Sequence, residues 1–356
     1  MEYKSPLHKT VMTTKTEFWN DSCAISELKP AIENGATGAT TNPVIVGNVL
    51  KKEMDLWRDR INALIKENPR DSEVDIAWKL NEEMAVKGAK LFEDVFKKEK
   101  GKKGRLSIQT NAQNYRNTEA MWKQAVHFNT LAPNIQVKMP VTKEGVEAVE
   151  ESTYQGVSVN ATVSFCVPQV LAVAEAVERG LERRKKEGKD ISQMSPICTM
   201  MVGRLDDALK AIWAKQGTPC DPGILEWAGI ACFKRAYKIY NEKNYQTRLL
   251  SAAYRNVMQW SEFVGGDVVL TITSDWQAII NKSGIDPDPD SMSKPVDPKV
   301  VDALLKYFPD FRKAYEPDGL KPEEFVDFLP TKRTLSQFLG GYASLLETIR
   351  GFMIKM

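Results

Sequence analysis

Eight short runs of strand-forming residues alternate with longer runs of helical pattern along this chain of 356 residues. A strand followed by a helix and a further strand is the unit of a parallel sheet covered by helices. Eight such units favour a closed barrel over an open sheet. We therefore predict the α/β fold class, and the chain is long enough for a single (β/α)8 TIM barrel with added helices. The predicted strands are residues 17–21, 37–41, 105–110, 135–138, 157–162, 197–202, 248–252 and 268–273.

The remaining segments predict how the chain is divided. Helical patterns cover residues 73–98, 167–186 and 222–241. Residues 285–299 are rich in proline and aspartate, which predicts an extended linker, and the pattern beyond them is helical again, ending in an amphipathic stretch over residues 334–356. We therefore predict a barrel with inserted helices over residues 1–284, a linker over 285–299, and a C-terminal helical extension over 300–356 that packs on the barrel.

Lys138 closes one predicted strand, and its position there indicates chemistry. Side chains alternate along a strand, so Ile135 and Val137 point to one face and Gln136 and Lys138 to the other. A lysine on the inner face is poorly suited to an ordinary core but well suited to the mouth of a barrel. Burial lowers the pKa of a lysine, and the neutral amine can attack a carbonyl group to form a Schiff base.

Other polar residues share this placement. Asp21, Gln109, Asn160 and Thr162 also lie near the C-terminal ends of predicted strands, which meet at one end of a barrel. Taken singly, each is better explained as a capping residue or as a hydrogen-bonded core residue. With Lys138 they form a group of five, and their convergence predicts an active site at that end.

Composition excludes several classes of function. A net charge of +2 gives no indication of nucleic-acid or membrane binding, and no run approaches the roughly 20 apolar residues of a membrane span. Residues 1–16 are polar and lack the apolar stretch of a signal peptide. The five cysteines form no CxxC motif, which favours a reduced, cytoplasmic protein.

Few residues are available for metals or cofactors. The only two histidines, His8 and His127, leave little room for a histidine metal site or a Ser-His-Asp triad, and we assign neither a role. No glycine-rich dinucleotide or ATP motif follows a predicted strand. We therefore expect no metal and no cofactor.

One basic segment has no predicted function. Residues 97–105 are rich in lysine and glycine and look like a solvated connection into the third strand. A phosphate-binding role is disfavoured for this segment, because a helix-to-strand connection lies at the end of a barrel opposite the chemistry.

Six segments carry recognisable motifs in order along residues 15 to 275. They are residues 18–22 (FWNDS), 38–43 (GATTNP), 137–145 (VKMPVTKEG), 159–165 (VNATVSF), 201–207 (MVGRLDD) and 253–256 (AYRN). Together they resemble the transaldolase family, a group of Schiff-base aldolases that includes the fructose-6-phosphate aldolases. Membership implies carbohydrate metabolism in the pentose phosphate pathway, sugar-phosphate substrates and a homodimer.

The resemblance also implies roles for individual residues. Lys138 would form a Schiff base with a ketose phosphate, and Asp21 would take the proton from the fourth-carbon hydroxyl as the bond between the third and fourth carbons breaks. An ion pair of Arg204 with Asp206 or Asp207 is the alternative to a phosphate-binding arginine. The further expected site residues are Gln109 and Thr162 around the catalytic water; Asn42, Asn160 and Thr199 around the substrate hydroxyls; and Arg204 and Arg255 around the phosphate.

Three departures from the family pattern bear on the function. Gln109 stands where transaldolases have glutamate, Met201 replaces phenylalanine and Ala253 replaces serine. The apolar Met201 favours a transferase that moves dihydroxyacetone between sugar phosphates. The other two changes motivate a lyase acting on fructose 6-phosphate or on a ketose with another anionic group, such as a sulfonate. A non-catalytic sugar-phosphate-binding barrel is the third hypothesis, and the retention of Asp21 and Lys138 argues against it.

Overall fold

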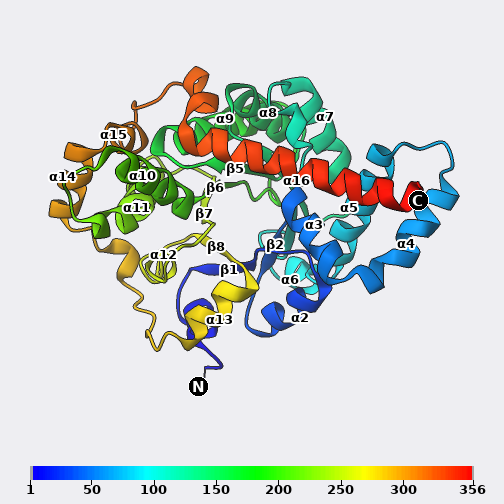
Figure 1. Ribbon diagram of the computed structural model, residues 1–356, viewed down its shortest axis with the longest axis horizontal. Coiled ribbons are helices and arrows are strands. Elements are labelled where there is room, and N and C mark those ends of the chain that lie inside the picture. The colour runs from blue at the N-terminus through cyan, green and yellow to red at the C-terminus, as the bar shows by residue number, and fades with distance from the viewer. Residues whose placement is uncertain (1–2, 355–356) are drawn as a thin grey trace.

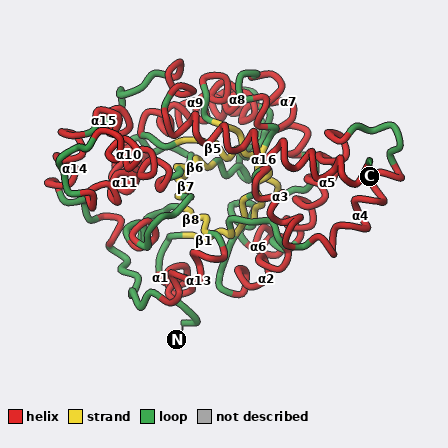
Figure 2. Tube along the Cα trace, viewed as in Figure 1, coloured by secondary structure: helices red, strands yellow, loops and turns green. Residues whose placement is uncertain are grey.

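The computed structural model describes residues 3–354 and forms a closed barrel of eight parallel strands in sequential order. In Figure 2 the strands occupy the centre and the helices surround them. The predicted (β/α)8 barrel is therefore confirmed, and each predicted strand overlaps an observed one. The strands are β1 Glu17–Asn20, β2 Gly38–Thr40, β3 Arg105–Gln109, β4 Ile135–Pro140, β5 Val159–Ser164, β6 Ile197–Met200, β7 Arg248–Ser251 and β8 Val269–Ile272.

Sixteen α-helices lie outside the barrel in the described part of the chain. The prediction for residues 167–186 is confirmed, whereas the helix predicted over 73–98 is two helices that are separated at Leu91 and the buried Phe92. The start of the helix predicted over 222–241 is a 3₁₀ helix, Pro222–Trp227, which α11 follows. The helices are α1 Pro6–Thr13, α2 Ile25–Glu33, α3 Pro43–Lys52, α4 Met54–Glu67, α5 Glu73–Lys90, α6 Glu93–Lys98, α7 Thr118–Asn129, α8 Lys143–Tyr154, α9 Val167–Lys186, α10 Val202–Gln216, α11 Ala228–Glu242, α12 Met258–Ser261, α13 Ser274–Lys282, α14 Pro298–Tyr307, α15 Pro309–Tyr315 and α16 Leu329–Met353.

The strands are buried on both faces, and the two faces differ in chemistry. Leu106 points outward and packs against α5, as alternation along β3 predicts. The next side chain, Ser107, points inward and donates to Gln136 Oε1 at 2.7 Å. Asn160 Nδ2 donates to Ser107 Oγ at 3.1 Å, and Thr199 Oγ1 donates to Asn160 Oδ1 at 2.7 Å. Four neighbouring strands are thus joined inside the barrel by a polar layer whose hydrogen bonds satisfy one another.

The segment after α13 is held against the barrel. It includes a short 3₁₀ helix, Ser291–Ser293, and the buried Met292. Lys234 of α11 donates to the carbonyls of Ser291 at 2.9 Å and Lys294 at 2.8 Å. Buried apolar residues from Leu7 to Ile349 belong to one core cluster. The division of the chain near residues 284 and 299 stays a prediction.

Helix α16 crosses the barrel on the side where the strands end. It runs across Figure 1 in red, and it contacts α3, α5, α10 and β5. The observed helix starts five residues before the predicted amphipathic stretch, and residues 355–356 of that stretch lie outside the described residues. No helix within residues 3–354 combines the length and the apolar character that crossing a membrane requires.

Close packing of α16 on α3 depends on Gly341, and this gives a test of the docking. A Cβ at Gly341 would lie 2.5 Å from Val44 Cγ2, whereas a Cβ at the adjacent Gly340 would meet nothing within 4 Å. Gly341→Leu should lower the free energy of unfolding by about 1–3 kcal/mol through overpacking. The matched control, Gly340→Leu, should be neutral or slightly stabilising, since it only replaces an exposed helical glycine. Denaturant unfolding measures the free energy of unfolding of both variants. Equal losses of stability would mean that α16 is not docked on α3 in this way.

Candidate active site

Lys138 lies inside the barrel near the C-terminal end of β4. Its side chain is 4% exposed, and within residues 3–354 its amine makes no hydrogen bond and has no carboxylate within ion-pair distance. Burial lowers the pKa of Lys138 below its ordinary value, the positive charge of Arg204 lowers it further, and the negative charge of Asp21 opposes both. The structure therefore favours a neutral amine at this position.

Asp21 directly follows β1 and is held by the strands on either side. Its backbone N–H donates to the carbonyl of Ile272 at 3.0 Å, and Thr40 donates to its carboxylate at 2.6 Å. Thr271 Oγ1 lies 2.7 Å from Thr40 Oγ1, so the two hydroxyls form a chain that ends on Asp21.

Burial raises the pKa of Asp21, and the nearby charges of Lys138 and Arg204 oppose that rise. Asp21 and Lys138 therefore act on each other electrostatically across the mouth of the barrel. Asp21 also lines a cavity of about 200 Å³ between α2, α3 and α13, whose lining does not include Lys138. A carboxyl group with a raised pKa is suited to accept and return a proton near neutral pH.

Two buried polar atoms beside Lys138 have no partner. Gln109 pairs with Lys138 in the β3–β4 register, and Thr162 pairs with Pro140 in the β4–β5 register. Gln109 Oε1 and Thr162 Oγ1 are both buried without a hydrogen bond to any residue of the described range 3–354. Buried polar groups are normally satisfied, so these two atoms indicate a place for a water or a substrate hydroxyl.

The backbone next to Thr162 is strained. Val163 has a φ of 58°, in the left-handed region that β-branched residues rarely adopt, and the β5–β6 register shifts between Ala161 and Ser164. Strain of this kind concentrates at functional sites, where the surrounding structure holds it in place.

The residues predicted to bind substrate hydroxyls are placed differently from one another. Asn42 caps α3, where its Oδ1 accepts from the N–H of Ile45 at 3.0 Å, so its amide nitrogen is left to donate. Asn160 and Thr199 are bonded to each other in the polar layer described above. A substrate hydroxyl can accept from the N–H of Asn160 that Ser107 leaves free, or donate to the second lone pair of its Oδ1.

Arg204 and Arg255 lie close together, but only one of them forms an ion pair. Burial lowers the pKa of Arg204, and the positive charge of Arg255 lowers it further. Among the described residues, Arg204 donates only to Thr334 of α16, at 3.4 Å, and its buried Nε has no partner there. Arg255 instead pairs with Asp207, through Nε at 2.9 Å and Nη2 at 2.7 Å.

Within residues 3–354 Arg204 therefore forms no ion pair with Asp206 or Asp207, and the surface ion pair that is the alternative to a phosphate-binding arginine is formed by Arg255 instead. Asp207 is occupied by Arg255, and the buried Asp206 accepts from the backbone of Gly229 at 2.8 Å and from Gln259 at 2.6 Å. Arg204 is left as a half-buried cation without a carboxylate in contact.

Gly203 explains why the two arginines are neighbours. A Cβ at this position would lie 2.2 Å from the carbonyl oxygen of Ala253 and 2.7 Å from Arg255 Cγ. The loop after β7 can therefore pack directly on the first turn of α10 only because residue 203 has no side chain.

The sequence did not reveal two residues of this site. Thr40 lies within the motif at residues 38–43, but its bond to Asp21 depends on the pairing of strands. Tyr254 is buried, and its hydroxyl donates at 3.5 Å to the carbonyl of Ser251, near enough to Asp21 for that charge to help raise its pKa. A tyrosine within the AYRN motif, where the family pattern has phenylalanine, was the available signal.

A closed (β/α)8 barrel carries a lysine and a carboxyl group at its C-terminal mouth, and the lysine is buried and unpaired within the described residues. This arrangement is typical of the class of barrel enzymes, whose active sites lie at that end. Comparison with known families then gives a match to the family described as Transaldolase/Fructose-6-phosphate aldolase over residues 18–307, and the chain belongs to this family.

Curated relatives agree with the family. The chain is 30% identical over 230 residues to a transaldolase of Thiobacillus denitrificans, covering 60% of this chain and 59% of the relative. It is 33% identical over 149 residues to a transaldolase of Parafrankia sp., covering 41% and 40%, respectively. It is 30% identical over 206 residues to Transaldolase 2 of Streptomyces avermitilis, covering 57% and 54%. The matches thus span less than two thirds of the length of these relatives.

Proposed function

We propose that this protein is a transaldolase-type transferase. It would move a dihydroxyacetone unit from a ketose phosphate, such as fructose 6-phosphate or sedoheptulose 7-phosphate, to an aldose phosphate. The observation that carries the proposal is the amine of Lys138, which is buried, unpaired within the described residues and under the electrostatic influence of Asp21.

The chemistry starts at Lys138. Its neutral amine attacks the ketone carbon, and loss of water gives an iminium. Asp21 then takes the proton from the fourth-carbon hydroxyl while the bond between the third and fourth carbons breaks. The electron pair of that bond moves into the iminium to form an enamine, and an aldehyde phosphate leaves. A second aldehyde phosphate accepts the enamine carbon, and hydrolysis frees Lys138. Because the iminium is the electron sink, the mechanism requires no metal or cofactor.

The other residues of the mouth would bind and orient the substrate. Gln109 and Thr162 would hold the water of Schiff-base formation between their unpartnered atoms. Asn42 would donate to a hydroxyl of the dihydroxyacetone unit, as would the free N–H of Asn160, with Thr199 fixing the Asn160 amide. Arg204 would be the main phosphate ligand, because Arg255 is already bound to Asp207.

Trapping and product analysis test the proposal. Fructose 6-phosphate with borohydride should give a covalent adduct on Lys138, and the absence of an adduct with any ketose phosphate would instead support a non-catalytic binding barrel. Release of glyceraldehyde 3-phosphate should accelerate when erythrose 4-phosphate is added as acceptor. Equal rates with and without acceptor would exclude the transferase.

A lyase is the second candidate, and Tyr254 is the observation that favours it. Met201 has no hydroxyl that could protonate the carbanion. Burial keeps the hydroxyl of Tyr254 protonated, and this hydroxyl lies near Asp21. A phenol there could protonate the enamine and release free dihydroxyacetone. Tyr254→Phe should then reduce acceptor-independent release of dihydroxyacetone and leave transfer to erythrose 4-phosphate intact. Equal loss of both activities would mean that Tyr254 only supports the loop. A cytoplasmic location and a homodimer stay predictions that neither candidate depends on.

A further inference from the structure

A second cavity lies at the opposite end of the barrel from Lys138. It measures about 490 Å³, within the range of small-molecule sites. Its lining includes Glu17 and Arg248, the first residues of β1 and β7, and Lys102 and Lys103 from the connection before β3. In a parallel barrel these positions lie at the N-terminal end of the strands, whereas Asp21 and Lys138 lie at the C-terminal end.

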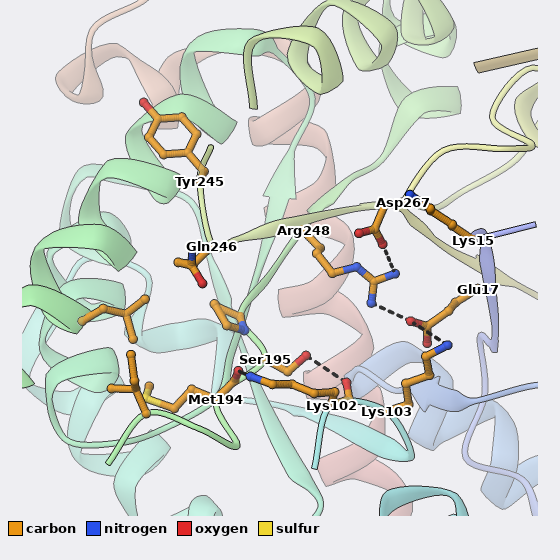
Figure 3. Close-up of a pocket in the computed structure, with 13 residues that line it drawn as sticks. Lys15, Glu17, Lys102, Lys103, Met194, Ser195, Tyr245, Gln246, Arg248 and Asp267 are labelled. Atoms are coloured by element: carbon orange, nitrogen blue, oxygen red, sulfur yellow. Dashed lines mark hydrogen bonds and ion pairs between the residues drawn. The ribbon is translucent and has the colours of Figure 1, made fainter. Parts of the chain in front are cut away.

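Positive charge in this cavity exceeds the negative charge that the chain provides. Both carboxylates of the lining serve Arg248, which pairs with Glu17 at 2.6 Å and with Asp267 at 2.9 Å (Figure 3). Glu17 also accepts from Thr37 at 2.7 Å. Three lysines share the remaining space, and Lys103 reaches Glu17 only at 3.7 Å.

The other two lysines have no carboxylate in contact. Lys102 donates to the backbone carbonyl of Met194 at 2.9 Å, and the amine of Lys15 makes no hydrogen bond or ion pair within residues 3–354. Arg105 lies behind Lys102, is 4% exposed, and donates only to the carbonyls of Gly101, Gln193 and Ile135. Partial burial of Lys102 lowers the pKa of its amine, the positive charge of Arg105 lowers it further, and the negative charge of Asp190 opposes both. An external anion would relieve this excess of cations.

The basic wall is built into the fold. Lys102 is held from both sides, since its carbonyl also accepts from Ser195 Oγ at 3.0 Å. A Cβ at Gly101 would lie 2.9 Å from Gln193 Cβ, so the connection before β3 packs tightly on the loop before β6. The backbone that carries Lys102 and Lys103 is thus positioned before any ligand arrives, which reduces the entropy that binding must offset.

Part of the remaining lining is apolar. Leu181 of α9, Ile191, Met194 and Pro196 form this part, and Ser195, Gln246 and Tyr245 complete the lining. In Figure 3, Arg248, Glu17 and Lys103 lie toward one side of the cavity and Tyr245 toward the other. Apolar walls with a few fixed polar groups are typical of small-ligand pockets, in which the polar groups set the orientation.

We propose that this cavity binds a small phosphorylated molecule with an apolar or aromatic body, its phosphates on Lys15, Lys102 and Lys103 and its body against Ile191 and Met194. The site is separate from the mouth and does not depend on the proposed function. It also places phosphates at Lys102 and Lys103 of the basic segment over residues 97–105, for which the sequence alone disfavoured a phosphate-binding role.

ADP is the probe, measured by isothermal titration calorimetry on the full chain. We expect saturable one-to-one binding with a Kd below about 1 mM. Lys102→Gln with Lys103→Gln should weaken it by about tenfold or more, whereas the matched control, Lys97→Gln with Lys98→Gln on α6, should not change it. Lys15→Gln should weaken it by about fivefold, and since no contact of Lys15 is lost, unfolding does not explain that result. Arg204→Gln should leave it unchanged, because Arg204 lies at the mouth.

Three results would overturn the proposal: no saturable binding up to about 1 mM, equal loss in the two double variants, or loss in Arg204→Gln. Pyrophosphate and adenosine separate the two halves of the ligand. Each should bind more weakly than ADP. If pyrophosphate binds as tightly as ADP, the apolar wall takes no part and the proposed ligand class is wrong.

Discussion

Lys138→Met should abolish both turnover and the borohydride-trapped adduct while the fold persists. Methionine has a similar length but no nucleophile, so no Schiff base can form. The variant should also be more stable near neutral pH, by about 1 kcal/mol, because a buried amine is replaced by an apolar group. Mass spectrometry of the trapped protein and denaturant unfolding measure the two effects.

The gain in stability of Lys138→Met should depend on pH in a definite direction. The pKa of Lys138 is lowered from 10.5 in the folded chain, so the unfolded chain binds more protons in the interval below 10.5. Stability of the parent protein should therefore rise with pH across that interval, and Lys138→Met should remove this contribution. Lys143→Met is the matched control, since Lys143 is exposed and pairs with Glu323 at 3.3 Å. An adduct that persists in Lys138→Met but not in the control would assign the nucleophile elsewhere.

Asp21→Asn should reduce turnover by about 10²–10⁴-fold while an adduct with dihydroxyacetone still forms. An amide accepts a hydrogen bond but does not take up a proton, so carbon–carbon cleavage loses its base. The charge of Asp21 raises the pKa of Lys138, and its removal lowers that pKa further. The pH profile of adduct formation should therefore move toward lower pH.

Glu27→Gln provides the control for Asp21→Asn. Glu27 lines the same cavity as Asp21 but binds Lys52 at 2.7 Å, so the same change of carboxylate to amide should leave turnover nearly unaltered. Rates of turnover and of trapping, measured over a pH series, distinguish the two variants. A profile that moves toward higher pH in Asp21→Asn would contradict the electrostatic coupling between Asp21 and Lys138.

The barrel could be predicted from sequence because each strand is a short run of strand-forming residues next to a helical pattern. β5 shows where this reasoning ends. It was predicted over residues 157–162 but spans Val159–Ser164. The left-handed Val163 and the register shift beside it depend on the neighbouring β6, and no local pattern signals them.

The candidate site, like the fold, could be predicted only as far as single strands determine it. Alternation along single strands placed Asp21 and Lys138 at one end of the barrel. Contacts that depend on its closure were not predictable, such as the bond between Thr40 and Thr271, whose positions are 231 residues apart. The partner of Arg255 likewise depends on Gly203, which allows the loop after β7 to approach α10.

The position of α16 has a consequence for synthesis of the protein. Arg204 meets its α16 partner, Thr334, which is encoded 130 residues later. During translation the strands that carry Asp21 and Lys138 leave the ribosome well before this helix does. Until Thr334 has been made, Arg204 lacks the one side-chain hydrogen bond that it donates within residues 3–354. The arginine proposed to bind phosphate therefore reaches its final surroundings only after all eight strands of the barrel have been synthesised.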